Sequence, residues 1–278
     1  LESGNILAEA KELVGSDIYF EFPSVGATGN LAMAAVRAKG VTRLCNCAKE
    51  PEITQLCEFL NSMGASIKGV GTETLIIQGV NELKSADIEI IPDRIEAGTF
   101  LISGALLGEI KVEDVIPEHL DNVINKLRET DCEIITTKNS VTVIPPENLK
   151  PVDMKTAVFP GFPTDLQAQW VALMSLANGS SVVTDTVYHD RFSHVPELSR
   201  LGANIRVKNN TAFISGKKSL VAAPVMSTDI RASASLIIAA LAAQGKTEIS
   251  RVYHIDRGYE NIEQKFKSLG ADINRISG

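Results

Sequence analysis

The stretches FPTDLQAQWVALMSLANGSSVV, from Phe162, and STDIRASASLIIAALAAQGKTEI, from Ser227, decide the fold because they are two versions of one pattern. Each has a polar start, an Ala- and Leu-rich run long enough for about three helical turns, a glycine, and an apolar run typical of a strand. Two more versions precede them, PSVGATGNLAMAAVRAKGVTRL from Pro23 and PDRIEAGTFLISGALLGEIKV from Pro92. Ordinary α/β segments can look alike by composition, but four copies that agree in order and spacing indicate an internal repeat.

A second predicted helix follows each strand and ends in the phrase Leu-x-x-x-Gly-Ala-x-Ile, which predicts a helix, a glycine stop and a strand. In the second copy, Thr130 and Asp131 stand where Gly-Ala stands elsewhere. Short strands then come in pairs, such as TLIIQGV and AFISGK, so the predicted unit is βαβαββ. It repeats every 64–72 residues when counted from Ser24, Asp93, Asp165 and Asp229. The glycines that close the first helices are expected to adopt left-handed caps: Gly40, Gly108, Gly179 and Gly245.

The first helix of each unit is apolar on nearly all sides; residues 236–241, for example, run without a charge. A helix with no polar face is buried, so we expect these helices to lie inside, covered by sheets and by the second helices. If three of them pack roughly parallel, their N-termini emerge on one face, each with free N–H groups and about half a positive charge. Convergent helix starts favour phosphate or carboxylate ligands.

Acids and arginines stand at these helix starts. Thr164-Asp165 and Thr228-Asp229 each place a hydroxyl before an acid, which also fits simple N-capping with Thr at the cap and Asp in the first turn. Arginines near the same ends favour an anion site instead, because guanidinium groups bind carboxylate and phosphate through paired hydrogen bonds. They are Arg94, Arg191 in YHDRFSHVPE, Arg231 and Arg257 in YHIDRGYE.

Composition narrows the choice of partners. The net charge of −7 argues against a nucleic-acid or anionic-membrane partner, and no apolar run reaches the length of a membrane span. The N-terminus has no basic region followed by an apolar stretch, so no signal peptide is expected, and the absence of a starting Met suggests a longer reading frame. We expect a cytoplasmic protein.

The cysteines and histidines show no metal-binding spacing. Cys45 and Cys47 are expected to share one face of a strand, but no second ligand pair follows, so Cys45, Cys47, Cys57 and Cys132 are interpreted as reduced and structural. No metal and no cofactor is expected.

Several of these strings together resemble one family. They are PSVGATGN, EPEI, PDRIEAGTF, FPTDLQAQ, RFSHVPELSRLGA, TDIRASASL and YHIDRGYE. In them the chain resembles UDP-N-acetylglucosamine 1-carboxyvinyltransferase, also called UDP-N-acetylglucosamine enolpyruvyl transferase, over essentially its whole length. The resemblance implies an α/β fold of six βαβαββ units in two pseudo-threefold domains, an inside-out α/β barrel. Four of the six units are expected here: residues 1–91 as the remaining third of the N-terminal domain, and residues 92–278 as the C-terminal domain.

The resemblance also implies a reaction. The family transfers the enolpyruvyl group of phosphoenolpyruvate to the 3′-hydroxyl of UDP-N-acetylglucosamine and releases phosphate, the first committed step of peptidoglycan precursor synthesis. Asp165 is implied as the acid/base beside the sugar hydroxyl. The implied contacts with the UDP-sugar are Phe22, Pro23, Ser24, Val25, Asp165 and Val187, and those with phosphoenolpyruvate are Arg231, Arg257 and, less directly, Arg191. Asp229 is a weaker candidate for the same rim, and Asp93 and Arg94 are expected at the crossing between domains.

The family's N-terminal lysine and its reactive cysteine in a Gly-rich loop have no counterpart here. The chain is therefore expected to lack the N-terminal third and to be inactive alone, unless a second polypeptide supplies the remainder. Two alternatives stay open: the shikimate-pathway enolpyruvyl transferase, and a non-catalytic remnant or interaction module.

Overall fold

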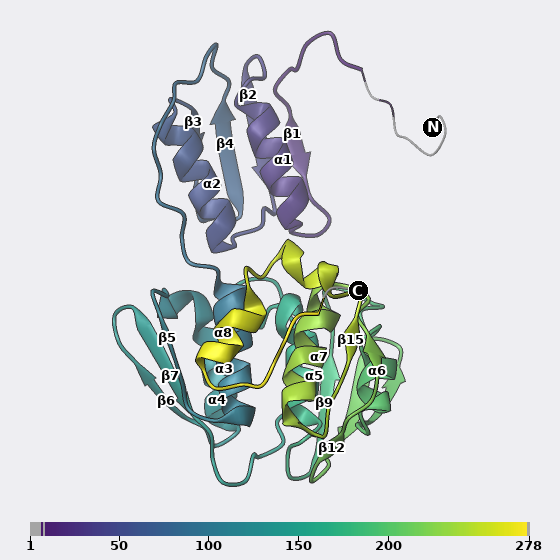
Figure 1. Ribbon diagram of the computed structural model, residues 1–278. Helices are drawn as coiled ribbons and strands as arrows, with labels where there is room; N and C mark the ends of the chain where they lie inside the picture. Colours follow the sequence, from purple (N-terminus) through teal and green to yellow (C-terminus); the bar gives the residue numbers. More distant parts are fainter. Residues whose placement is uncertain (1–6, 8, 277–278) are drawn as a thin grey trace. The chain divides into compact units, whose positions relative to one another are not determined.

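The computed structural model describes residue 7 and residues 9–276 (Figure 1). Contacts within the chain divide it into two compact units, Leu1–Ile91 and Pro92–Gly278, which we call unit 1 and unit 2. The boundary coincides with Pro92, whose missing N–H cannot continue a strand ladder from the preceding residues.

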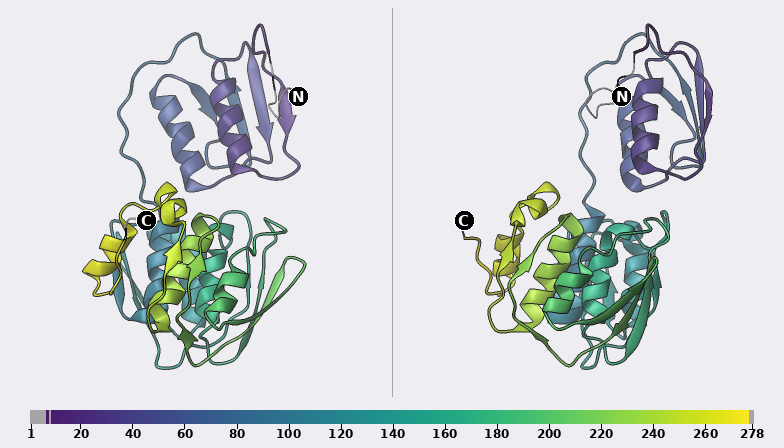
Figure 2. Two further views of the ribbon diagram at one scale, coloured as in Figure 1. Left: turned by 45° about the vertical axis from the view of Figure 1, so that its right-hand side comes forward. Right: turned by 90° about the vertical axis from the view of Figure 1, so that its right-hand side faces the viewer.

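Unit 1 is one complete βαβαββ repeat. In its sheet β1 pairs parallel with β2, and β4 pairs antiparallel with both β2 and β3. Helices α1 and α2 cover one face of this sheet (Figure 2). The elements in chain order are β1 (Asp17–Tyr19), α1 (Val25–Ala35), β2 (Val41–Cys45), α2 (Pro51–Ser62), β3 (Ser66–Lys68) and β4 (Thr74–Gln78).

Unit 2 contains three repeats whose first helices are packed together at its centre. The first comprises α3 (Arg94–Leu107), β5 (Ile110–Glu113), η1 (Pro117–Leu120), α4 (Asp121–Glu129), β6 (Glu133–Thr136) and β7 (Ser140–Ile144). The second comprises β8 (Met154–Lys155), η2 (Thr164–Leu166), α5 (Gln167–Met174), β9 (Ser180–Thr184), α6 (Val195–Arg200), β10 (Asn204–Lys208) and β11 (Thr211–Ser215). The third comprises β12 (Leu220–Val221), β13 (Val225–Met226), α7 (Ile230–Ala242), β14 (Ala243–Gln244), β15 (Ile249–Ser250), η3 (Val252–Arg257) and α8 (Ile262–Ser268).

The expected repeat is confirmed in topology but is not complete in every copy. The sheet order β8-β9-β11-β10 reproduces β1-β2-β4-β3 of unit 1, and β5-β7-β6 is the same order without a first strand. Residues 87–91, where the first strand of this repeat is expected, form no strand with the described residues. The Gln55 side chain contacts their backbone, accepting from Ile91 N at 3.2 Å and donating to the Glu89 carbonyl at 2.8 Å. The strand expected to end at Ile273 is also wrong, since no strand within the described residues pairs with residues 271–276.

The prediction of buried central helices is confirmed for unit 2. All eight residues of α5 are buried, as are Ala97–Ala105 of α3 and Ala232–Ala239 of α7. These helices contact one another and share one apolar cluster with the sheets around them. Helix α1 of unit 1 is different, since only Thr28, Gly29, Ala32 and Ala35 are buried. A single repeat covers one side of its first helix, whereas three repeats cover all sides.

Several local expectations need correction. Gly40, Gly108, Gly179 and Gly245 all have positive φ, but only Gly108 caps its helix; the others lie three to five residues past it. In the degenerate phrase Asp131 itself takes the glycine position, with a φ of 68°. Cys45 and Cys47 do not share a strand face, because β2 ends at Cys45 and Asn46 turns the chain with a φ of 58°.

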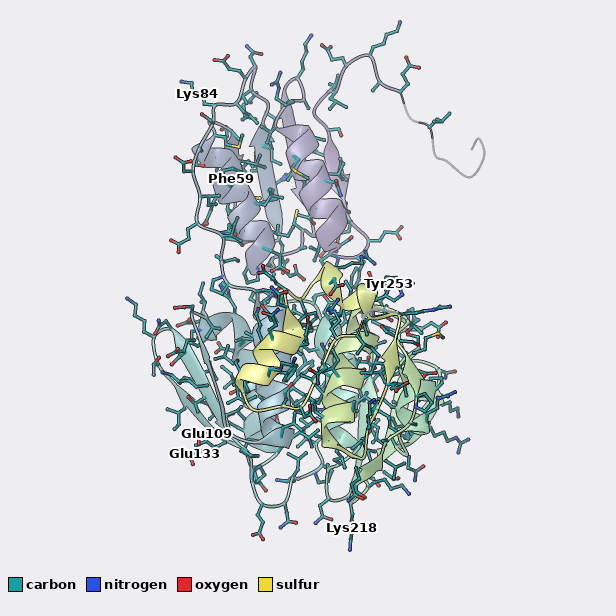
Figure 3. The ribbon with its side chains drawn as sticks, viewed as in Figure 1. Phe59, Lys84, Glu109, Glu133, Lys218 and Tyr253 are labelled. Atoms are coloured by element: carbon teal, nitrogen blue, oxygen red, sulfur yellow. The ribbon has the colours of Figure 1, made fainter. Side chains whose placement is uncertain are left out.

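Charged side chains are exposed on both units, for example Lys84 of unit 1 and Glu109, Glu133 and Lys218 of unit 2 (Figure 3). In the part of the chain that the structure describes, no helix is both long and apolar enough to cross a membrane.

Candidate functional site

The starts of α3 and α7 are closed by aspartates. Asp93 Oδ1 accepts from Ile95 N and Glu96 N at 2.7 and 3.1 Å, and Asp229 Oδ1 accepts from Arg231 N and Ala232 N at 2.9 and 3.2 Å. Both carboxylates therefore satisfy N–H groups that the helix leaves open. The expected capping by Thr228 is wrong, since Asp229 is the cap itself.

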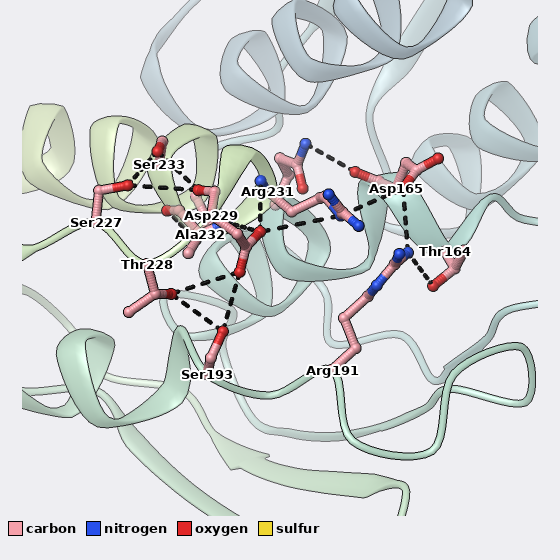
Figure 4. A network of polar contacts seen from close by, with 12 residues as sticks. Thr164, Asp165, Arg191, Ser193, Ser227, Thr228, Asp229, Arg231, Ala232 and Ser233 are labelled. Carbon is pink, nitrogen blue, oxygen red and sulfur yellow. Dashed lines mark hydrogen bonds and ion pairs between the residues drawn. The ribbon is translucent and has the colours of Figure 1, made fainter. Parts of the chain in front are cut away.

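Asp165 occupies the same place in its repeat but caps nothing. The chain enters α5 through the 3₁₀ turn η2, and no side chain caps either element. The Asp165 carboxylate is left 46% exposed and is held by two arginines instead: Oδ1 lies 3.1 Å from Arg191 Nη1 and 3.3 Å from Arg231 Nε (Figure 4). The interpretation of Thr164-Asp165 as a simple cap is therefore wrong.

The two arginines are anchored away from bulk water. Only 14% of the Arg191 side chain and 26% of the Arg231 side chain are exposed. The Arg191 guanidinium lies over the Tyr188 ring, 3.8 Å from its centre, and donates to Thr164 Oγ1 at 2.9 Å. Arg231 Nε also lies 3.9 Å from the capping Asp229. Two poorly hydrated guanidinium groups beside one half-exposed acid form a site that can bind an anion and move a proton.

A fully buried carboxylate, Asp185, lies behind this pair. Its Oδ2 accepts from Thr164 Oγ1 at 2.6 Å. Its Oδ1 accepts from Thr156 Oγ1 at 2.8 Å and from the backbone N–H groups of Val187 and Tyr188 at 2.9 Å each. Asp185 was not predicted as a site residue from the sequence. It directly follows the predicted strand SSVVT and precedes a predicted loop, and an acid in that position could have been named as a candidate.

The α7 start is surrounded by polar and buried groups. Ser193 Oγ donates to Asp229 Oδ2 at 3.0 Å, and His194 beside it is buried. Burial lowers the pKa of His194 to about 4, against the opposing effect of the Asp229 charge. Burial alone raises the pKa of Asp229, but hydrogen bonds from Ala232 N, Ser193 and Arg231 N, with the Arg231 charge, outweigh it and lower that pKa. A neutral imidazole and an ionised cap thus coexist here near neutral pH.

Comparisons with known proteins identify the family. The EPSP synthase family (3-phosphoshikimate 1-carboxyvinyltransferase) matches residues 1–266. The chain belongs to this family.

Individual relatives and solved structures are also similar to this chain. The UDP-N-acetylglucosamine 1-carboxyvinyltransferase of Chloroherpeton thalassium is 55% identical over 99% of this chain, and that of Desulfosudis oleivorans is 50% identical over 100%. This chain spans 65% of the first relative's length and 67% of the second's. Among solved structures, the enolpyruvyl transferase NikO from Streptomyces tendae has a TM-score of 0.86 at 26% identity, covering 95% of this chain and 66% of NikO. An Acinetobacter baumannii EPSP synthase, at 17% identity and a TM-score of 0.70, shares the fold, covering 92% of this chain and 63% of that chain.

Not all of the site residues predicted from the sequence of this chain contact Asp165. Val187 is partly buried and follows Asp185 in the same loop. Arg257 is the last residue of η3; it is exposed and makes no hydrogen bond or ion pair with any residue that the structure describes. The segment Phe22–Val25 lies in unit 1, where Ser24 caps α1 by accepting from Ala27 N at 3.3 Å. Phe22 is 45% exposed.

A second polar cluster joins α3, α5 and the segment after η3, and sequence reasoning missed it too. The Tyr259 hydroxyl lies 2.7 Å from Thr99 Oγ1 and 3.3 Å from Gln169 Nε2, and all three residues are buried. Burial raises the pKa of Tyr259 to about 12, although the bonds to Thr99 and Gln169 oppose it. Tyr259 is thus a neutral hydroxyl that ties the helices together below their starts.

Within the described ranges, no group of three or more His, Cys, Asp or Glu side chains is arranged to hold a metal ion. The cysteines are free, and burial raises the pKa of Cys57 to about 11, which makes that thiol unreactive near neutral pH.

Proposed function

We propose that this chain is the larger part of an enzyme that transfers the enolpyruvyl group of phosphoenolpyruvate to the 3′-hydroxyl of UDP-N-acetylglucosamine, releasing phosphate, in the synthesis of peptidoglycan precursors. The observation that carries the proposal is the uncapped Asp165, half exposed between Arg191 and Arg231. The curated relatives at 50–55% identity carry that activity in their names, which favours the sugar nucleotide over shikimate 3-phosphate as the acceptor.

In the proposed reaction Asp165 takes the proton from the 3′-hydroxyl as the sugar oxygen bonds to C2 of phosphoenolpyruvate, and a general acid in the complementing segment proposed below gives a proton to C3. The resulting ketal then loses phosphate, and C3 returns a proton to that same group to restore the double bond. Arg231, Arg257 and Arg191 bind the carboxylate and phosphate of phosphoenolpyruvate, where fixed positive charge stabilises the developing charge. Phe22, Pro23, Ser24 and Val25, through the helix start that Ser24 caps, and Val187, through its loop, contact the UDP-sugar.

We also propose that a further polypeptide segment, the N-terminal part of such enzymes, completes unit 2 and the site. The first and second repeats of unit 2 each end in a hairpin, β6-β7 and β10-β11, whereas the described residues of its third repeat form none. A groove of about 1300 Å³ lies in this repeat, lined by residues 107–110, the C-terminal end of α7, residues 245–249, α8 and residues 270–276. An extended segment with alternating apolar side chains fits this groove, because it can pair with the backbone of residues 271–276 and cover the partly buried Ala240 and Leu241.

We further propose a cytoplasmic location, which the free cysteines support. Through wall synthesis, the proposed reaction would also give the protein roles in cell shape and division.

Ligand binding by the chain itself tests the substrate class. The shift in melting temperature is measured with UDP-N-acetylglucosamine and, separately, with shikimate 3-phosphate, since a ligand that binds only the folded state raises apparent stability. A rise in melting temperature with the sugar nucleotide alone supports the proposal. A rise with shikimate 3-phosphate alone supports the alternative, a shikimate-pathway enolpyruvyl transferase. Arg231→Gln serves as the site variant and Arg200→Gln, at an exposed arginine on α6, as its matched control.

Turnover needs the complementing segment. The chain is co-expressed with the N-terminal part of the Chloroherpeton thalassium relative, and phosphate release from phosphoenolpyruvate is followed. Co-purification with turnover supports an enzyme; co-purification without turnover, and without ligand binding, supports the interaction-module alternative.

A further inference from the structure

Asp185 occupies a repeat position at which the residues of the other three copies turn the chain. Six residues after the glycines Gly40, Gly108, Gly179 and Gly245 stand Asn46, Asp114, Asp185 and Arg251. Asn46, Asp114 and Arg251 have φ values of 58°, 53° and 56° and turn the chain away from the strand end. Asp185 is absent from the residues with positive φ, and its side chain is fully buried. The repeat that holds Asp165 therefore departs from the common pattern at both its helix start and its strand end.

The four hydrogen bonds to Asp185 come from three separate segments. Thr156 follows β8, Thr164 begins η2, and Val187 and Tyr188 belong to the loop after β9. One buried carboxylate thus fixes the start of the Asp165 helix relative to the loop that carries Arg191. Both oxygens of the buried carboxylate are satisfied, because each has at least one donor within 2.9 Å.

The bond from Thr164 to Asp185 also fixes which way the Thr164 hydroxyl points. A hydroxyl has one hydrogen, and Thr164 gives it to Asp185 Oδ2 at 2.6 Å. Its lone pairs are then free to accept from Arg191 Nη1 at 2.9 Å, and the same Nη1 reaches Asp165 Oδ1 at 3.1 Å. The chain Asp185–Thr164–Arg191–Asp165 therefore has one defined direction of donation from Arg191 to Asp185.

We infer that Asp185 is a positioning residue that, through the Thr164 hydroxyl, holds the Arg191 guanidinium against Asp165. Its purpose rests on the proposed function, since Arg191 and Asp165 are the groups that would meet phosphoenolpyruvate and the sugar hydroxyl. Asp185 itself is fully buried and reaches neither ligand.

The test observes the Arg191 side chain directly. The side-chain N–H signals of Arg191 are observed by nitrogen-15 NMR in the full chain at low temperature and assigned with Arg191→Lys. Hydrogen bonds from one Nη to Thr164 and Asp165 slow rotation of the guanidinium, so separate Nη signals are expected in the native chain. Thr164→Val and Asp185→Asn remove the acceptor or its anchor and are expected to merge these signals.

Two variants separate positioning from general stability. Thr164→Ser keeps the hydroxyl and is expected to restore the separate signals. Thr156→Val removes one of the three donors to Asp185 Oδ1, together with the acceptor for Thr186 N. The backbone donors Val187 and Tyr188 still hold that oxygen, and Oδ2 keeps Thr164, so the separate signals are expected to persist. Trp170 fluorescence, from the single and buried tryptophan in unit 2, checks that each variant is folded.

Separate Arg191 signals that survive in both Thr164→Val and Asp185→Asn would overturn the inference. Phosphoenolpyruvate, titrated into the same samples, gives the second reading, with affinity expected to fall about tenfold in Thr164→Val and to stay near native in Thr164→Ser. If the native chain, co-purified with the complementing N-terminal segment, binds neither phosphoenolpyruvate nor UDP-N-acetylglucosamine, the proposed function fails, while the Arg191 signals still decide the role of Asp185.

Discussion

The starts of α5 and α7 occupy the same place in two neighbouring repeats, yet their aspartates do different things. Asp229 accepts from two backbone N–H groups and closes α7, whereas Asp165 accepts from none and reaches Arg191 and Arg231. The difference lies in the entry to the helix, since α7 begins directly after its cap and α5 begins through a 3₁₀ turn. In a repeat protein, a copy that lacks the helix cap found in the other copies is therefore where catalytic residues should be sought.

The largest expected effect is the acid sensitivity of the α7 start. Buried His194 has its pKa lowered to about 4, while an unfolded histidine titrates near 6.5, so the unfolded chain binds the extra proton between these values. Stability contributed by neutral His194 is present above about pH 6.5 and is lost as pH falls to about 4, by about 3 kcal/mol. Urea unfolding followed by Trp170 fluorescence measures it.

His194→Gln is the control for that measurement, because it removes the titrating group and keeps a polar side chain. The variant should lose much less stability than the native chain between pH 7 and pH 4. An identical pH dependence in the two proteins would show that His194 is not the group responsible.

The next effect separates the two aspartates by stability. Asp229→Ala removes a helix cap and the acceptor for Ser193, and should lower the free energy of unfolding of unit 2 by about 2 kcal/mol. Asp165→Ala removes a half-exposed carboxylate, while Arg231 keeps Asp229 and Arg191 keeps Thr164 and Tyr188, so it should cost only about 0.5 kcal/mol. Both are read by urea unfolding at Trp170. Equal losses of stability would contradict the distinction between the two aspartates, because they would mean that Asp165 stabilises its helix as Asp229 does.

A smaller effect extends the comparison to unit 1. Ser24 caps α1, so Ser24→Ala should lower the local stability of α1 by about 1 kcal/mol, measured by amide hydrogen exchange over residues 25–35. The matched control is Ser16→Ala, at an exposed serine whose side chain bonds to no residue within the described ranges. Unchanged exchange in Ser24→Ala would show that α1 is held by packing alone.

The repeat was predictable from sequence because its signals are local. Helix composition, stop glycines and strand pairs recur at fixed spacing, and the burial of α3, α5 and α7 follows from their lack of a polar face. The missing strand at residues 87–91 was not predictable, since a strand needs a partner in a sheet, and the sheet β5-β7-β6 includes no strand from these residues.

The site was predictable in part. Asp165, Arg191 and Arg231 were named from their positions at helix starts and after a strand, and the structure brings all three together. Which aspartate would cap could not be predicted from the Thr-Asp pair, because Thr164-Asp165 and Thr228-Asp229 share it but enter their helices with different backbone conformations. Asp185 was missed because its four donors come from three segments separated in sequence.

The most direct test of the account compares Asp165→Asn with Asp229→Asn in the chain co-expressed with its complementing N-terminal segment. The two substitutions are chemically identical and sit at the same repeat position, and Asn still caps a helix well. The rate of phosphate release from phosphoenolpyruvate with UDP-N-acetylglucosamine should fall on the order of 10³-fold in Asp165→Asn, as expected for loss of a general acid/base, and by less than about tenfold in Asp229→Asn. Equal rates in the two variants would contradict the claim that Asp165 was released from capping to act on the substrate.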